Sequence, residues 1–196
     1  GQRMLALVNN LLDLSRLEST VGEIELRPQD IEPALRAVVD ELQSLATARQ
    51  ISLHAPAQSV SMWAAADGQR LQQVLRNVLA NAIRFAPPAS TIELGWQAGA
   101  DHEWRIQVRD HGPGIPTDEL DAIFEAFVQS SRTKDGSGGT GLGLAICRKI
   151  MAGHHGSISA QNPPEGGAIF EIRLPMLPAS ETSAAKAAPQ PQRTPA

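Results

Sequence analysis

The chain has 196 residues, of which 17 are basic and 21 acidic, so its formal net charge is −4 and its pI is near 5.7. Hydrophobic residues make up 42%, which suffices for a core and excludes a wholly disordered chain. The mild acidity and the lack of a basic stripe argue against a nucleic-acid-binding protein. At roughly 100–200 residues per domain, this length predicts one sizeable domain with an appendage.

Features that the sequence lacks constrain the expected cellular location of the protein. The single cysteine, Cys147, can form neither an internal disulfide nor a zinc site of several cysteines. No apolar run approaches the roughly 18 residues that span a bilayer, and no signal peptide is found. We therefore expect a cytoplasmic location. Because Gly1 is followed directly by a helical pattern, we expect a piece of a longer protein.

Residues 1–20 are predicted to be a separate helical segment, because apolar side chains recur at spacings of three and four over 2–19. A single helix cannot bury so broad a stripe, so partner helices from an upstream segment or a second chain are expected. The alternative is a helix that docks on the chain's own domain.

Residues 21–177 are predicted to form one α+β domain. Asp30 is the expected N-cap of a helix over 31–49, and Asp67 that of a long helix ended by Pro87 and Pro88. A further helix is expected over 141–152, and alternation predicts strands at 51–55, 59–63, 91–97, 103–110, 157–162 and 168–175. Adjacent strand pairs predict two layers, with helices on one face of a mixed, largely antiparallel sheet.

Residues 178–196 contain no side chain suited to a core, and Pro and Ala dominate them. This composition is typical of a flexible linker or tail. It suggests that another domain follows in the parent protein.

A turn rich in glycine directly follows the strand predicted to end at Asp110. Gly112 and Gly114 let the backbone turn tightly and approach a planar ligand. The Asp110 carboxylate can accept a hydrogen bond from an exocyclic amine such as that of adenine. An ordinary Asp/Gly turn is the alternative interpretation.

A second cluster has five glycines within residues 136–143 and leads into a predicted helix. Such a loop presents free N–H groups and a positive helix end to phosphate oxygens. The spacing is not that of a P-loop, because no Lys-Ser/Thr pair follows the last glycine. Alone it would be a flexible loop, but the two clusters together predict a nucleotide site.

The long helix adds polar residues beside its apolar stripe. Asn77 and Asn81 are four residues apart and share a face, with Arg84 close to it. Magnesium and phosphate oxygens are candidate partners, and surface asparagines are the alternative. His111, His154 and His155 suggest a metal, but no further ligand has suitable spacing for zinc. The apolar stripe itself comprises Leu71, Val74, Leu75, Val78, Leu79, Ala82 and Ile83.

These segments, in this order, resemble the ATP-binding catalytic domain of sensor histidine kinases, within the Bergerat-type fold shared with gyrase and Hsp90. The resemblance covers about residues 2–176. It rests on RLQQVLRNVLANAIRFA (70–86) as the N box, DHGPGI (110–115) as the G1 box, IFEAFVQ (123–129) as the F box, GGTGLGLAI (138–146) as the G2 box, and Gly166-Gly167.

The resemblance implies roles by position. Asn81 matches the Mg²⁺ ligand, Asp110 matches the adenine-reading carboxylate, and Arg84 stands where the family usually has lysine. Residues 128–139 match a mobile ATP lid flanked by Phe124 and Phe127. The remaining implied ATP-binding residues are Asn77, Phe85, Gly112, Gly114, Ile115, Arg132, Lys134, Gly139, Thr140, Gly141, Leu142 and Gly143.

LLDLSRLES (11–19) resembles the end of the second helix of a dimerisation and phosphotransfer domain. None of the five histidines has the context of a phospho-acceptor, so that histidine is expected outside this chain. The resemblance implies a two-component kinase that takes Mg²⁺ and ATP, is a homodimer in full length, and passes phosphate to a response-regulator receiver. The parent is expected at the bacterial inner membrane. The receiver is a candidate for the domain after the tail, which would make a hybrid kinase.

Two alternatives stay open. An ATPase of the same fold typically has a glutamate where this chain has Asn77, and an amide is a poor general base. A pseudokinase scaffold would signal through its helices alone, although the intact glycine boxes argue against it.

Overall fold

A computed structural model describes residues 23–132 and 141–187. The helix predicted over 2–19 and the tail beyond 187 lie outside the described residues. The elements are β1 (Arg27–Asp30), α2 (Glu32–Ala48), β2 (Ser52–His54), β3 (Trp63–Ala66), α3 (Gly68–Phe85), β4 (Thr91–Ala98), β5 (Glu103–Asp110), short 3₁₀ turns at Thr117–Glu119 and Ala122–Phe124, α4 (Gly143–Gly153), β6 (Ser157–Gln161), β7 (Ala168–Pro175) and α5 (Ala179–Ala187).

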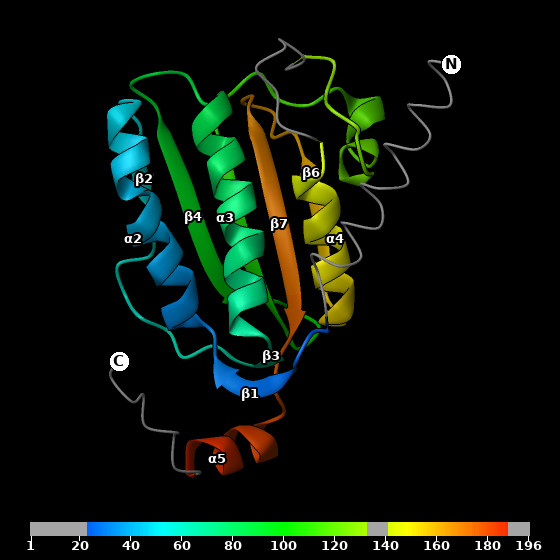
Figure 1. Cartoon of the computed structure of the whole chain (residues 1–196). Helices are drawn as coiled ribbons and strands as arrows, with labels where there is room; N and C mark the ends of the chain where they lie inside the picture. The colour runs from blue at the N-terminus through cyan, green and yellow to red at the C-terminus, as the bar shows by residue number, and fades with distance from the viewer. Residues whose placement is uncertain (1–22, 133–140, 188–196) are drawn as a thin grey trace, which may run out of the picture.

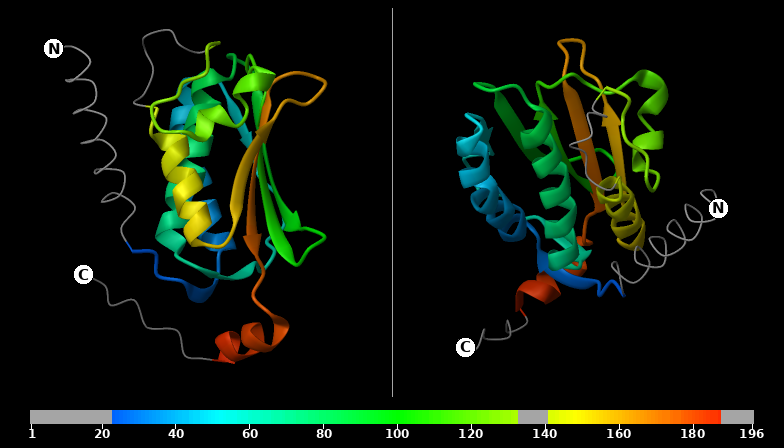
Figure 2. Two further views of the ribbon diagram at one scale, coloured as in Figure 1. Left: turned by 90° about the vertical axis from the view of Figure 1, so that its right-hand side faces the viewer. Right: turned by 45° about the horizontal axis from the view of Figure 1, so that its top comes forward.

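The main sheet has five strands in the order β2-β4-β5-β7-β6, and only β2 and β4 run parallel. The parallel pair needs a crossover, which β3 and α3 provide. Helices α2, α3 and α4 lie together on one side of this sheet, as the side view shows (Figure 2). The predicted α+β architecture with a mixed, largely antiparallel sheet is confirmed. A separate ribbon, β1 with β3, closes the lower end in Figure 1.

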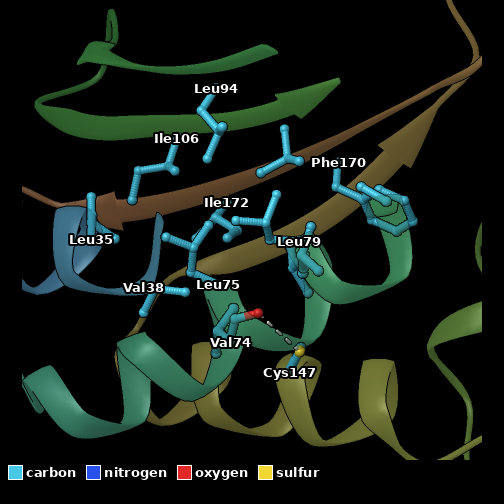
Figure 3. Close-up of a cluster of buried hydrophobic side chains, with 14 of the residues drawn as sticks. Leu35, Val38, Val74, Leu75, Leu79, Leu94, Ile106, Cys147, Phe170 and Ile172 are labelled. Carbon is cyan, nitrogen blue, oxygen red and sulfur yellow. Dashed lines mark hydrogen bonds between the residues drawn. The ribbon is translucent and has the colours of Figure 1, made fainter. Parts of the chain in front are cut away.

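Helix α3 lies between α2 and α4 and supplies the centre of the core (Figures 1 and 3). All seven residues of its predicted apolar stripe are buried. They meet inward-facing strand residues such as Leu94, Ile106 and Ile172 (Figure 3). Asp67 caps the helix as predicted, because its Oδ1 accepts the Arg70 N–H at 3.1 Å. The spacing of apolar residues therefore determined both the extent and the buried face of α3.

The face of the sheet away from the helices carries charged residues that pair across strands. Glu171 is only 7% exposed, and its carboxylate accepts from Gln107 Nε2 at 2.6 Å and from Arg173 Nε at 2.7 Å. Burial raises the pKa of Glu171, but the hydrogen bonds from Gln107 and Arg173 outweigh it, so the net pKa is lowered. The alternation of apolar and charged residues is that of an antiparallel sheet covered on one side.

Two local expectations were wrong, and one strand was not predicted. Ile31, not Asp30, is the N-cap of α2; Asp30 Oδ1 instead accepts from Met62 N–H at 2.9 Å and Glu32 N–H at 3.2 Å. The strand expected at 59–63 begins only at Trp63, and its partner β1 was not predicted. The reason is that β1 reads RPQD, without alternation, so only its pairing with β3 makes it a strand.

Part of the segment predicted to be a flexible tail is helical. Residues Ala179–Ala187 form α5, whose alanine content favours a helix. The Lys186 ammonium lies 5.8 Å from the centroid of the Trp63 ring, and the Leu177 N–H donates to Trp63 O at 2.9 Å. The first part of the tail is therefore attached to the β1–β3 ribbon. No helix in residues 23–132 and 141–187 is long and apolar enough to cross a bilayer.

Helices α3 and α4 are joined at their lower ends by a buried histidine. His154, 2% exposed, accepts the Asp67 N–H at Nε2 over 3.0 Å, and its Nδ1 lies 2.8 Å from Ile150 O. Because Nε2 accepts, Nδ1 is the ring nitrogen that can donate to Ile150 O. His154 therefore ties the start of α3 to the end of α4.

Replacing His154 by leucine leaves the Asp67 N–H without this acceptor. We expect the free energy of unfolding, measured by urea denaturation, to fall by about 1–3 kcal/mol. The matched variant His54→Leu, at an exposed position of β2, is expected to change it by less than about 0.5 kcal/mol. Equal losses in the two variants would contradict a role for the Asp67 contact.

Candidate nucleotide-binding site

A cavity of about 290 Å³ opens where α3 ends, α4 begins and the chain leaves β5, at the top of Figure 1. Its size is at the lower end of the range for small-molecule sites. It brings together eight of the residues that the sequence predicts for ATP: Asn81, Arg84, Phe85, Asp110, Gly114, Ile115, Gly141 and Gly143. Two helix ends and a strand end that are distant in sequence thus meet in one place.

Asp110 is the last residue of β5 and lines this cavity although it is only 5% exposed. Its Oδ1 accepts the Gly112 N–H at 2.7 Å. Burial raises the pKa of Asp110, and the N–H groups of Gly112 and Ala168 oppose that rise. A buried carboxylate beside an open cavity is suited to accepting a hydrogen bond from an amine of a bound ligand.

Gly112 does not line the cavity but makes its wall possible. A Cβ on Gly112 would lie 2.8 Å from Phe85 O and 2.9 Å from Asp110 Oδ1. Only glycine therefore lets the loop after β5 pack against the end of α3. The resemblance implied that Gly112 binds ATP, but Gly112 is not among the residues that line the cavity.

The polar residues of α3 that were predicted for the site lie in two different environments. Asn81 and Arg84 line the cavity, and the Arg84 guanidinium lies 5.1 Å from the centroid of the Phe85 ring. Asn77, one turn earlier, is not among the lining residues. Its Nδ2 donates to Gly143 O at 3.2 Å and lies 3.7 Å from Cys147 Sγ. Asn77 thus joins α3 to the first turn of α4.

The second glycine cluster is only partly described. Gly141 and Gly143 line the cavity, whereas Leu142 is the N-cap of α4 and is not among the lining residues. Gly141 O accepts the Phe127 N–H at 3.0 Å, so these two residues, one on each side of the predicted lid, are in direct contact. Lys134, Gly139 and Thr140 lie outside the described residues.

Arg132, which the resemblance implies for ATP binding, is not among the residues that line the cavity. Its guanidinium donates to Pro113 O at 2.7 Å, on the loop that follows Asp110. The preceding backbone is held as well, because the Ser131 N–H donates to Glu119 Oε2 at 2.9 Å.

Sequence reasoning missed part of the lining. Phe170 and Ala168 were expected as core strand residues, and alternation gave no signal that they also border a cavity. The segment 123–129 was recognised as a box, but not for its contribution of wall residues. Val128, Gln129 and Ser130 line the cavity and were predicted only as part of the lid. The lining residues that were not predicted in any such role are Ala82, Pro113, Ile123, Leu144, Ala168 and Phe170.

Residues 66–178 match the protein family described as histidine kinase-, DNA gyrase B-, and HSP90-like ATPase. The chain belongs to this family. Among curated relatives, the signal transduction histidine-protein kinase AfsQ2 of Streptomyces coelicolor is 35% identical over 177 residues, which is 90% of this chain and 31% of AfsQ2. The sensor protein KdpD of Escherichia coli is 35% identical over 89% of this chain and 19% of KdpD. The chain thus spans less than a third of either relative.

Solved structures of this ATPase family agree with the fold. Full-length ShkA in complex with AMPPNP is 33% identical, with a TM-score of 0.70 over 90% of this chain and 36% of ShkA. The catalytic domain of the histidine kinase ThkA, in a nucleotide-free form, is 28% identical, with a TM-score of 0.68 over 79% of this chain and 99% of that domain. The predicted resemblance to the catalytic domain of sensor histidine kinases is confirmed.

The burial of Asp110 has a measurable effect on stability. The ordinary pKa of this group is 3.8, and burial raises it in the folded state. The contribution of the Asp110 side chain to the free energy of unfolding is therefore fully present below the ordinary pKa. It is lost as the pH rises through the raised pKa of the folded state. Relative to Asp110→Asn, which does not titrate, the wild type is expected to lose unfolding free energy as the pH rises above the ordinary pKa of 3.8 and through the raised pKa of the folded state. Urea denaturation of both proteins across this range measures the difference; a difference constant with pH would contradict it.

Proposed function

We propose that this chain is the ATP-binding catalytic part of a two-component sensor histidine kinase. It would transfer the γ-phosphoryl group of ATP to a histidine outside this chain. The observation that carries the proposal is that Asp110, Asn81, Arg84 and Gly143 line one and the same cavity. The family supplies the ligand, because ATP binding is a property of these domains, and the similar ShkA structure contains AMPPNP.

We propose that the nucleobase of ATP binds at Asp110, and we call this part of the cavity the base end. The Asp110 carboxylate would accept the exocyclic amine of adenine, while Ile115 and Phe170 would contact the ring. Gly112 already satisfies one carboxylate oxygen. The cavity wall around Asp110 is largely apolar. A nucleobase without an amine opposite Asp110 would therefore leave the carboxylate without its hydrogen bond, which disfavours binding of such nucleobases.

The phosphate end is proposed at Asn81, Arg84 and the start of α4. The Asn81 side-chain oxygen is the kind of hard ligand that Mg²⁺ takes, and Mg²⁺ is commonly held by one or two protein oxygens together with phosphates. The ion would neutralise phosphate charge when bound. The Arg84 guanidinium and the backbone N–H groups near Gly143 would hold the phosphate oxygens. We propose the same end for the undescribed Lys134, Gly139 and Thr140, together with Leu142.

The acceptor and partners are proposed from the relatives. Phosphoryl transfer demands positioning and charge neutralisation more than covalent chemistry from the protein, and Arg84 with the α4 N–H groups provides both. ThkA has been solved in complex with the response regulator protein TrrA, so a receiver domain is the proposed next acceptor. We propose a homodimeric parent anchored at the membrane, with residues 1–20 as its second phosphotransfer helix and a receiver after the tail.

Hydrolysis of ATP as the main activity is disfavoured by Asn77. Its side chain donates to Gly143 O and does not line the cavity, and an amide lacks the basicity to activate water. The pseudokinase alternative would require a cavity that takes no nucleotide.

Nucleotide binding is tested by calorimetric titration with ATP, with and without Mg²⁺. Asp110→Asn is expected to weaken binding about 10- to 100-fold in both conditions, because it removes a charged acceptor. Asn81→Ala is expected to weaken binding only when Mg²⁺ is present. The control Asp118→Asn, exposed and outside the cavity, should bind as the wild type does. A folded wild type that releases no heat at several temperatures would favour the pseudokinase alternative.

Phosphoryl transfer is tested with γ-labelled ATP and the histidine-bearing domain of the parent protein. The chain alone is expected to take up no label, whereas the added domain should become labelled on histidine at a rate that Asp110→Asn reduces. Release of inorganic phosphate without labelled histidine would instead support an ATPase.

A further inference from the structure

The loop of residues 113–115, directly after the Asp110 turn, lines the cavity without belonging to a helix or strand. Ile115 is only 8% exposed. Backbone groups of a partly buried loop need hydrogen-bond partners, and no strand within residues 23–132 and 141–187 pairs with this loop. Its position must therefore be determined by side chains from other elements.

Asn162, the first residue after β6, supplies both partners of Ile115. Its Oδ1 accepts the Ile115 N–H at 3.0 Å, and its Nδ2 donates to Ile115 O at 2.5 Å. One side-chain amide thus satisfies both backbone groups of a residue 47 positions away, as a paired strand would. Asn162 is itself exposed and does not line the cavity, so it acts only through Ile115.

Two further contacts show how closely the loop is held. Gly114 has a φ of +70°, and a Cβ there would lie 3.0 Å from Gly167 O and 3.2 Å from Asn162 Oδ1. On the other side of the loop, Arg132 donates to Pro113 O at 2.7 Å. The loop is therefore held between the β6–β7 turn and Arg132, in the first part of the predicted lid.

We propose that Asn162 is a positioning residue for nucleotide binding, which fixes the Ile115 backbone so that the base end of the cavity is formed before the nucleotide arrives. This inference rests on the proposed function. A preformed loop spares the ligand the entropic cost of ordering it, so Asn162 contributes to affinity without touching the ligand. Since Ile115 lies at the base end, the contribution is the same for a nucleoside and for a nucleotide.

Two substitutions at Asn162 distinguish the effect of its hydrogen bonds from the effect of its side-chain volume. Asn162→Ala removes donor and acceptor together. Asn162→Asp keeps the shape and the acceptor, but it sets a carboxylate oxygen against Ile115 O, where the donor stood. The isosteric aspartate variant is therefore expected to be no better than the alanine variant. Gln161→Ala, at the exposed neighbouring position, is the control.

The affinities of wild type and variants for ATP and for adenosine are measured by titration, and amide exchange at Ile115 is followed by NMR. We expect Asn162→Ala and Asn162→Asp to weaken both ligands by a similar factor of about ten, since each of two hydrogen bonds contributes modestly. Exchange of the Ile115 amide should become faster in both variants without ligand, and Gln161→Ala should change nothing.

The outcomes distinguish this role from the proposed function. A wild type that binds no ATP overturns the proposed function and this role with it. If the wild type binds ATP and the Asn162→Asp variant binds it with equal affinity, only the role of Asn162 is overturned. Loss of affinity for ATP with unchanged affinity for adenosine would overturn it as well, because the effect would then lie at the phosphate end.

Discussion

The packing of α3 between α2 and α4 is the constraint on which the rest of the molecule depends. Its buried stripe, from Leu71 to Ile83, meets the sheet and both neighbouring helices. Truncating one such leucine to alanine typically costs about 2–5 kcal/mol, so the helix has little freedom to shift or rotate. Because Asn81 and Arg84 lie beside the stripe on the same helix, the core that fixes α3 also fixes these two residues in the cavity wall.

Helix α4 is tied to α3 at two levels. His154 joins its end to Asp67, and Asn77 joins its start to the carbonyl of Gly143. Between them, Cys147 packs in the core, and burial raises the pKa of its thiol to about 12, so it is an inert apolar side chain. The two helices therefore present their upper ends as one unit.

The cavity is shaped at the expense of stability. Asp110 is kept in a buried position where its ionised form is disfavoured, and close backbone contact at Gly112 excludes a side chain. Proteins commonly give up stability at binding sites in this way. The loop that follows compensates with hydrogen bonds supplied from outside the site, by Asn162 and Arg132, which leave the cavity itself open.

The sequence by itself determined the α+β class and the boundaries of α3 and of the β4–β5 hairpin. It also indicated that Asn81, Asp110 and Gly143 belong to one site, and all three line the same cavity. Helical spacing, alternation and glycine clusters made this possible because they are local signals. The sequence could not determine β1, whose residues become a strand only beside β3, nor the helix α5 within the tail. It also could not assign Asn77 to Gly143, Arg132 to Pro113, or Asn162 to Ile115. Each of these contacts joins residues distant in the chain, and no local pattern reveals which backbone group a polar side chain will reach once the sheet and helices have packed.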